Sequence, residues 1–457
     1  MRKINKLFIM SILASATMMS CSEDSLDPTL AVNKSVETSI NTEEDLQGIL
    51  LGMYNRLTST QYYGRDIIIY GDSRSDNAFS NGNSGRFVTV STMAMTETDG
   101  QATGTWTQIY EVIASANIVI GAEVTGDETT INHIKGQAYA VRALAHFDAL
   151  RLYGQQHVQS GGLSALGVPY VTEFKGENLL PARNTVGEVK ALMEEDFATA
   201  LSLMSASLND PSKQYITTHA VNGLWSRVEI YFGDYQKALT AAAAVVNSNQ
   251  FSIVPAGDFV ASWSTDGAVN SIFELAVNNN DNLGINGLAN IYRGNTYGDI
   301  QAYDAFANIF DAGDIRGSAE MIDVDGAGNL RNIGKYPSAT FDDNISIIRY
   351  EEVVLNYAEA LQNTGGNGLV FLNSVATNRN ALPYATASQA NIMLERRKEL
   401  AFEGFRFDDL ARSQMDIPFL DPNQAGPAYG SYNYAFPIPA VETNANSNMV
   451  QNFGYSN

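Results

Sequence analysis

Apolar residues recur every three or four positions along several stretches of the chain, and this spacing predicts amphipathic helices. One stripe consists of Ala140, Leu144, Phe147 and Leu150, and another of Val189, Met193, Phe197, Ala200 and Met204. The first stripe leads to Tyr153-Gly154, where the glycine predicts a helix stop. The second follows Thr185, whose pairing with Glu188 is typical of a capping box at a helix start.

Two further stretches predict pairs of helices that fold back on each other. The first pair has Ala220, Leu224, Val228 and Tyr231 before the break Gly233-Asp234-Tyr235, and Ala238, Leu239, Ala242 and Val245 after it. The second has Ile347, Tyr350, Val354, Tyr357 and Leu361 before Gly365-Gly366, and Leu369, Leu372 and Val375 after it. Helices joined by so short a break lie antiparallel. The pattern therefore predicts a mostly α fold, a scaffold of degenerate tetratricopeptide-like repeats with few short strands.

The segments 58–104 and 250–340 differ from these helical blocks. They are rich in Gly, Asn, Asp, Ser and Tyr and show little periodicity. Loops this long are uncommon in compact domains unless they carry function. Aromatic faces beside Asp, Asn and Arg suit sugar rings, which stack on the aromatic and offer hydroxyls to the polar groups. The same mixture suits a peptide or a protein surface, and tyrosines that merely pack the loops onto the helices are the plainer alternative.

The composition is that of a globular and strongly acidic chain. Its 457 residues are 45% hydrophobic, and 28 Lys+Arg against 50 Asp+Glu give a formal net charge of −22. Such a surface repels nucleic-acid phosphates and anionic membrane faces. One cysteine excludes an intramolecular disulfide and any Cys-rich metal site. The four histidines accompany no nucleophile elbow, His-Glu-x-x-His or phosphate-binding loop, so we expect no catalytic site, no metal and no cofactor.

The N-terminus has the features of an export signal. Arg2, Lys3 and Lys6 precede an apolar run from Leu7 to Met19, which is shorter than the roughly 20 residues that span a bilayer. The following Ser20-Cys21 completes a resemblance to a bacterial lipobox, in which cleavage exposes the cysteine for lipid attachment. We therefore expect a signal peptide over 1–20, lipidation of Cys21 and a flexible tether over 21–41. Loss of three positive charges with the signal leaves a net charge near −25.

The most densely charged segment spans residues 395–410. Glu399 and Glu403 within it are four residues apart, and retaining glycosidases hold two carboxylates about 5 Å apart. Catalytic carboxylates flank a substrate from both sides, however, and neighbours on one helix face rarely do so. Arg396 and Arg406 also offer ion pairs three residues onward. We interpret the segment as a structural ion-pair network.

The run Asp323 to Asn329 has some features of a calcium loop. An EF-hand requires its turn glycine at the sixth position, whereas Gly326 stands at the fourth position of this run. The sequence therefore favours a hairpin turn here.

The charged segment also carries a resemblance to a known family. It is similar to the C-terminal signature of the SusD/RagB family at Glu395-Arg396, Glu399-Leu400, Phe402-Glu403-Gly404, Arg406, Asp409-Leu410 and Arg412. Further similarities follow in the family's order: Val141-Arg142-Ala143 to Val168-Pro169, Arg183-Asn184-Thr185, Arg349-Tyr350-Glu351-Glu352-Val353, Tyr357-Ala358-Glu359-Ala360, Phe436-Pro437-Ile438-Pro439 and Gln451-Asn452-Phe453-Gly454-Tyr455. Phe407 and Phe453 depart from the Trp and Pro that the family often has, but both keep apolar bulk.

The resemblance implies an N-terminal region over 42–215 and a C-terminal SusD/RagB region over 216–457 in one compact body. It also implies a function. Such proteins are non-enzymatic surface lipoproteins of the outer membrane that act as the lid of a SusC-like TonB-dependent barrel and capture oligosaccharides for import. Two alternatives stay open, namely a peptide-binding lid of the RagB kind and a helical-repeat scaffold for surface enzymes.

Ligand-contacting loops vary within this family, so we choose candidate binding residues by composition and by placement in the loop-rich segments. They are Asp72, Arg74, Asp76, Asn77, Phe79, Arg86, Trp106 and Tyr292. For Trp106, which begins a predicted helix with Tyr110 and Asn117, a place in the core is an equally good interpretation.

Overall fold

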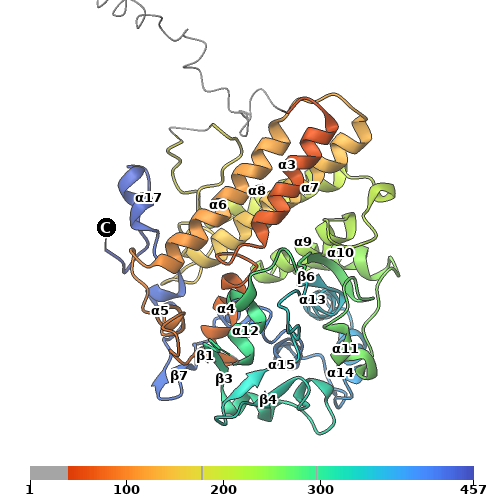
Figure 1. Cartoon of the computed structure of the whole chain (residues 1–457), viewed down its shortest axis with the longest axis vertical. Coiled ribbons are helices and arrows are strands. Elements are labelled where there is room, and N and C mark those ends of the chain that lie inside the picture. Colours follow the sequence, from red (N-terminus) through yellow and green to blue (C-terminus); the bar gives the residue numbers. More distant parts are fainter. Residues whose placement is uncertain (1–39, 176–178, 295, 457) are drawn as a thin grey trace, which may run out of the picture.

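The computed structural model describes residues 40–175, 179–294 and 296–456 and is dominated by helices (Figure 1). The α-helices are α3 (Glu43–Leu57), α4 (Asp66–Ser73), α5 (Val88–Ser91), α6 (Gly100–Gly121), α7 (Glu128–Tyr153), α8 (Val186–Leu203), α9 (Thr218–Phe232), α10 (Tyr235–Val246), α11 (Ala256–Ser262), α12 (Leu288–Arg293), α13 (Tyr350–Asn363), α14 (Leu369–Thr377), α15 (Gln389–Glu399), α16 (Arg406–Arg412) and α17 (Ala440–Ala445). Short 3-10 helices are η3 (Ala206–Leu208), η4 (Gly284–Asn286), η5 (Asp304–Ile309), η6 (Ile315–Gly317) and η7 (Tyr432–Tyr434). The expected mostly helical fold is confirmed.

The strands of the described residues are few and short. They are β1 (Ala78–Ser80), β2 (Ser271–Leu275), β3 (Ile300–Ala302), β4 (Ile322–Val324), β5 (Leu330–Asn332), β6 (Ile345–Arg349), β7 (Phe419–Asp421) and β8 (Gln424–Ala425). Each belongs to a two-stranded antiparallel sheet, with the pairs β1–β3, β2–β6, β4–β5 and β7–β8. The β4–β5 pair confirms the hairpin turn that was expected within the run Asp323 to Asn329.

The long helices α3, α6, α7 and α8 pack against one another and occupy the upper half of the molecule in Figure 1. Side-chain caps fix where they begin: Thr42 and Thr185 form capping boxes, and Asp99 and Asp127 accept hydrogen bonds from backbone N–H groups of the first turn. Helix α7 is buried over most of its length and ends at Gly154, as its sequence predicts.

The two predicted hairpins are present, α9 with α10 and α13 with α14. Gly233 takes the left-handed backbone (φ 72°) that ends α9, and Asp234 caps α10 one residue later. Helix α10 also packs on α13, so successive helix pairs stack along the chain. One boundary in this region differs from the prediction. Ile347 lies in strand β6 rather than on the helix, which begins at Tyr350, because the residues on either side of it pair with β2.

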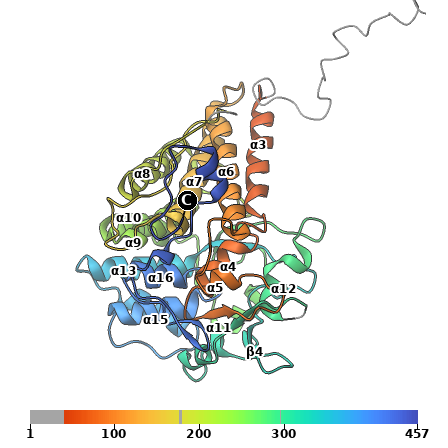
Figure 2. The ribbon, with the colours of Figure 1, turned by 90° about the vertical axis from the view of Figure 1, so that its left-hand side faces the viewer.

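The two loop-rich segments form the lower part of the molecule together with helices α13, α15 and α16 (Figure 2). Both contain short elements, and a sheet joins them: Ala78 of β1 pairs with Ala302 of β3, and Ser80 with Ile300. The division expected at 215/216 falls between η3 and α9 and stays a prediction. The signal peptide, the lipidated Cys21 and the tether expected before residue 40 lie outside the described residues.

The charged segment forms a buried ion-pair network, as predicted. The Glu399 carboxylate receives hydrogen bonds from Arg379 (2.8 and 2.9 Å), Arg349 (3.1 Å) and Arg316 (3.1 Å). Burial acts to raise the pKa of Glu399, but the three guanidinium groups hold it well below its usual range. Both carboxylate oxygens of Glu399 are thereby paired with arginines, which is the arrangement of a structural group.

The pairs expected three residues apart in that segment are not the ones that form. Arg396 donates to Asp409 (3.0 Å) instead of Glu399, and Arg406 donates to Asp76 (2.7 Å) instead of Asp409. The reason is tertiary, because α16 packs back on α4 and brings partners from other elements closer than the neighbours along the helix. In the described part of the chain, no helix combines the length and apolarity needed to cross a bilayer.

Candidate ligand-binding site

Asp72 lies at the end of α4 and is completely buried. Its carboxylate accepts hydrogen bonds from the backbone N–H groups of Phe402 (3.0 Å) and Gly404 (2.9 Å), and from the Asn77 side chain (3.1 Å). Burial raises the pKa of Asp72 to about 6 in spite of these donors. Both oxygens thus hold the turn after α15, and Asn77 orients one of them.

Arg74 caps the end of α4 and is also buried. Its guanidinium lies 3.8 Å from the ring centroid of Phe407 and 4.6 Å from that of Phe436, and it donates to the carbonyls of Asn433 (3.0 Å) and Tyr434 (2.8 Å). Burial lowers the pKa of Arg74 to about 10. The side chain ties the C-terminal segment to α4.

Trp106 and Tyr292 are core residues in this structure. The centroid of the Trp106 ring lies 4.7 Å from that of Tyr110 and 4.9 Å from that of Tyr153, which it meets edge-on. Tyr292 of α12 stacks on Tyr336 at 6.1 Å. Their rings are covered by other side chains of the protein.

Arg86 is partly exposed and joins the two loop-rich segments. Its guanidinium lies 3.9 Å from the centroid of the Tyr297 ring and donates to Asn286 Oδ1 (3.1 Å). A guanidinium held over an aromatic ring and near an amide oxygen is a rigid contact between the loops.

Asp76 and Phe79 are the two candidates that line an open cavity. This aromatic cavity has a volume of about 320 Å³ and lies where β1, β3 and β7 meet, at the lower left of Figure 1. It is lined by Asp76, Phe79, Gln301, Ala302, Tyr303, Asp304, Ala305, Arg397, Phe419 and Pro422.

Three aromatic rings form a row along the aromatic cavity. The centroids of Phe79 and Tyr303 are 4.9 Å apart, and those of Tyr303 and Phe419 are 5.7 Å apart. Phe79 and Tyr303 are largely buried, whereas Phe419 is 46% exposed. The row therefore offers an exposed apolar face at one end of a firmly packed base.

Polar side chains stand beside the rings, and one of them, Asp76, is held in place by ion pairs. The Asp76 carboxylate is held by Arg406 (2.7 Å) and Arg397 (3.0 Å). These two arginines outweigh burial and lower the pKa of Asp76, so it is ionised at neutral pH. Gln301 and Asp304 add an amide and an exposed carboxylate. An aromatic face flanked by donors and acceptors matches the amphipathic surface of a sugar ring.

The structure thus brings Asp76 and Phe79 together in one cavity, and places Asp72, Arg74, Asn77, Trp106 and Tyr292 in the interior. A ligand-binding role for the eight candidates stays a prediction. Sequence reasoning did not single out Gln301, Asp304, Arg397, Phe419 and Pro422. Only the pairing of β1 with β3 and the contact of β7 with β1 bring these distant positions together, and no local pattern signals it.

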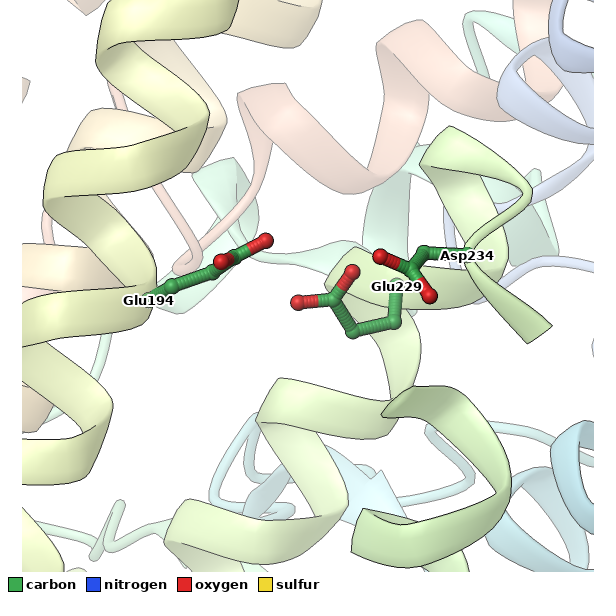
Figure 3. A group of neighbouring side chains, drawn as sticks. All are labelled: Glu194, Glu229 and Asp234. Atoms are coloured by element: carbon green, nitrogen blue, oxygen red, sulfur yellow. The ribbon is translucent and has the colours of Figure 1, made fainter. Parts of the chain in front are cut away.

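Figure 3 shows the group of carboxylates in the described residues that are close enough to share a cation, Glu194, Glu229 and Asp234. Lysines already balance them. Lys190 Nζ lies 3.1 Å from Glu229 and 3.5 Å from Asp234, and also contacts Glu194. Lys237 Nζ lies 2.7 Å from Glu194. The group is therefore an ion-pair cluster that joins α8, α9 and α10.

Comparison with known proteins gives consistent similarities over the whole chain. Residues 26–230 match a family described as starch-binding and associating with the outer membrane, and residues 334–455 match the SusD family. The SusD-like protein P2 of Formosa agariphila is 23% identical, with 99% of both chains covered. The starch-binding protein SusD of Bacteroides thetaiotaomicron is 32% identical over 28% of this chain and 25% of its own.

A solved structure has the same fold. It is that of a putative sugar-binding protein from Bacteroides vulgatus, which is 27% identical to this chain and superposes with a TM-score of 0.84. The match covers 92% of this chain and 100% of that one. The arrangement of helices and short sheets described above is therefore shared along nearly the full length.

Proposed function

The chain belongs to the SusD/RagB family, and on that premise we propose that it captures oligosaccharides at the cell surface as the lid of a SusC-like TonB-dependent transporter. The family is one of non-catalytic binding proteins associated with the outer membrane. A non-catalytic role fits the ion-pair network, in which Glu399 and Glu403 form ion pairs with buried arginines and a lysine.

The aromatic cavity is the observation that carries the glycan assignment. Phe419 presents an exposed ring at the end of a packed aromatic row, and Asp76, Gln301 and Asp304 stand beside it. Stacking of a sugar ring on Phe419 would leave its hydroxyls within reach of these polar side chains. A relative described as starch-binding and a solved structure described as sugar-binding support the same ligand class.

Anchoring by a lipid on Cys21 completes the proposal. The lipobox-like Met18-Met19-Ser20-Cys21 would leave the mature protein tethered, and its net charge near −25 would repel the body from anionic lipid. A tethered body that swings away from the membrane suits a lid on a barrel. Mass spectrometry of the mature N-terminal peptide tests the anchor: a diacylated or triacylated Cys21 supports it, and an unmodified Cys21 contradicts it.

Titration of the purified protein with a panel of oligosaccharides tests the glycan assignment. We expect at least one glycan to bind and the Phe419→Ala variant to bind it about two- to ten-fold more weakly, since stacking on one ring is worth about 0.5–1.5 kcal/mol beyond the area that it buries. Phe453→Ala is the matched control, because that phenylalanine is 54% exposed and lies outside the aromatic cavity. Binding of peptides but of no glycan would contradict the assignment.

A further inference from the structure

One buried hydroxyl of the aromatic cavity lacks a hydrogen-bond partner. Tyr303 directly follows β3 and is 7% exposed, and its hydroxyl oxygen is buried with no partner among the described residues. Other buried polar atoms without a partner, such as Ser73 Oγ and Asp299 Oδ2, belong to residues that do not line this cavity. Buried polar groups are rarely left unpaired. The Tyr303 hydroxyl is therefore a group to which a molecule in the aromatic cavity can supply the missing partner.

Two carboxylates stand near this hydroxyl without bonding to it. Burial raises the pKa of Tyr303 above its usual value, and the charges of Asp421 and Asp76 add to the shift, so the hydroxyl keeps its proton. Asp76 lines the cavity. Asp421 lies in the chain between Phe419 and Pro422, which line it as well. The unpartnered hydroxyl is thus on the cavity side of Tyr303, close to acidic groups.

Asp76 has capacity for one more donor. Its Oδ1 accepts a hydrogen bond from Arg406 Nε (2.7 Å), whereas its Oδ2 accepts one from Arg406 Nη2 (3.0 Å) and lies 3.0 Å from Arg397 Nη1. Each oxygen of a carboxylate can accept about two hydrogen bonds. Oδ1 can therefore take a second donor while the two arginines hold the carboxylate in position.

These groups define the chemistry of the partner. It has to accept a hydrogen bond from Tyr303 and donate one to Asp76, and a sugar hydroxyl does both. An ammonium group cannot accept. A carboxylate or sulfate cannot donate, and it would face the negative charges of Asp76, Asp304 and Asp421. The charged side chain of opposite sign in the wall, Arg397, is already paired with Asp76.

The neighbouring ring allows a ligand to reach the hydroxyl. Of the two rings in contact with Tyr303, that of Phe79 is 7% exposed and that of Phe419 is 46% exposed. Phe419 begins the β7–β8 hairpin, whose residues 422–425 are exposed. A sugar that stacks on Phe419 can therefore turn this side chain aside. The cavity volume of about 320 Å³ is at the lower end of small-molecule sites, so a short part of a glycan chain fills it.

We propose that the aromatic cavity selects uncharged glycans, because Tyr303 donates to a sugar hydroxyl that in turn donates to Asp76. This inference rests on the proposed capture of oligosaccharides and narrows the ligand class to neutral sugars, excluding uronic acids and sulfated sugars. Tyr303 is then the residue that determines specificity, while Phe419 supplies the stacking surface.

The oligosaccharide panel used in the glycan titration can test the selection by charge. Its neutral members are maltoheptaose, laminarihexaose, xylohexaose and mannohexaose, and its acidic members are hexagalacturonate and a chondroitin sulfate hexasaccharide. Titration in about 0.15 M salt screens charges farther away than roughly 8 Å, so the net charge of the whole protein contributes little. We expect a neutral member to bind and both acidic members to bind at least about ten-fold more weakly.

The Tyr303→Phe variant tests the role of the hydroxyl. It keeps the ring and removes only the oxygen, and we expect it to bind the neutral glycan about two- to ten-fold more weakly. Its free energy of unfolding should not fall, because the hydroxyl has no partner within the described structure to lose. Tyr432→Phe is the matched control, since that tyrosine is 40% exposed and outside the aromatic cavity, and it should leave the affinity unchanged.

Three results would overturn the inference and leave the capture of glycans standing. They are tighter binding of an acidic member than of every neutral one, an unchanged affinity of Tyr303→Phe for the bound neutral glycan, and a loss of stability in Tyr303→Phe, which would show that the hydroxyl is bonded inside the protein. Absence of binding by every member of the panel would overturn the inference together with the proposed function.

Discussion

At the scale of single residues, burial decides what a polar side chain does. Of the eight side chains chosen as binding candidates, Asp72 and Arg74 have their polar groups turned to backbone atoms of other segments. Their residue types were chosen for sugar chemistry, and the same chemistry serves to fasten a turn or a C-terminal segment. Sequence alone does not separate the two uses, since exposure depends on segments hundreds of positions away.

His146 shows how a buried residue gives a measurable pH dependence. Its Nδ1–H donates a hydrogen bond to the Arg142 carbonyl (2.9 Å), and its Nε2 accepts one from the backbone N–H of Val171 (3.0 Å). The ring also stacks on Tyr170 with centroids 3.7 Å apart. A second proton on Nε2 would face the N–H of Val171, and burial lowers the pKa of His146 to about 3.

The consequence is a loss of stability in mild acid. The imidazole protonates near pH 6.5 in the unfolded chain but not in the folded one, so its contribution is complete above pH 6.5 and is lost as the pH falls toward 3. Between pH 7.5 and 5.0 this costs about 2 kcal/mol. We expect His146→Gln to be less stable at pH 7.5 but to lose about 2 kcal/mol less over that range, as measured by denaturant unfolding. Parallel losses in both proteins would contradict this account.

At the scale of elements, local pattern predicts helices well and their partners poorly. The stripes at 140–150, 189–204 and 220–245 gave helices with the predicted stops and caps, because periodicity and capping are properties of neighbouring residues. The apolar spacing predicts a helix at Ile347, which lies in β6, because local spacing gives no sign that this strand pairs with β2. For the same reason, the sequence does not indicate that Phe419 lies in the aromatic cavity, because its strand β7 contacts β1 only in the folded chain.

Two glycines in helices are expected to respond in opposite ways to alanine. A Cβ on Gly71 of α4 would lie 2.0 Å from the carbonyl oxygen of Gly404, so the helix could not keep its close approach to that turn. A Cβ on Gly52 of α3 would meet nothing within 4 Å. We expect Gly71→Ala to lower the free energy of unfolding by about 1–3 kcal/mol and Gly52→Ala to raise it by about 0.5–1 kcal/mol. Thermal and denaturant unfolding measure both, and a neutral Gly71→Ala would contradict the close packing.

At the scale of the whole molecule, the ion-pair network joins the helical body to the loop-rich lobe. Glu399 contacts Arg316 of η6, Arg349 of β6 and Arg379 after α14, and all of these groups are buried. The sequence predicted a network in this segment because the charges are so dense, but three of the four groups come from outside it. Water and salt screen the charges of an ion pair on a helix surface. The charges of this network are buried, so water cannot solvate a group that has lost its partner.

Removal of one partner therefore has a large predicted effect. We expect Glu399→Gln to lower the free energy of unfolding by about 3–5 kcal/mol, because three arginines lose a buried counter-charge. Glu111→Gln is the matched control. It breaks the pair of Arg56 and Glu111, whose side chains are each 46% exposed, and should cost less than about 1 kcal/mol. If the two substitutions lowered the free energy of unfolding equally, burial would not make the loss of an ion-pair partner more costly, and this account would be contradicted.

The central claim is that this protein captures glycans for an outer-membrane importer. Its most direct test is purification of the mature protein from native outer membranes in gentle detergent, followed by identification of the proteins and carbohydrate that remain bound. The account predicts a TonB-dependent barrel in near-equal amount together with an oligosaccharide. Recovery of surface enzymes without a barrel, or of a barrel with bound peptide and no carbohydrate, would contradict it.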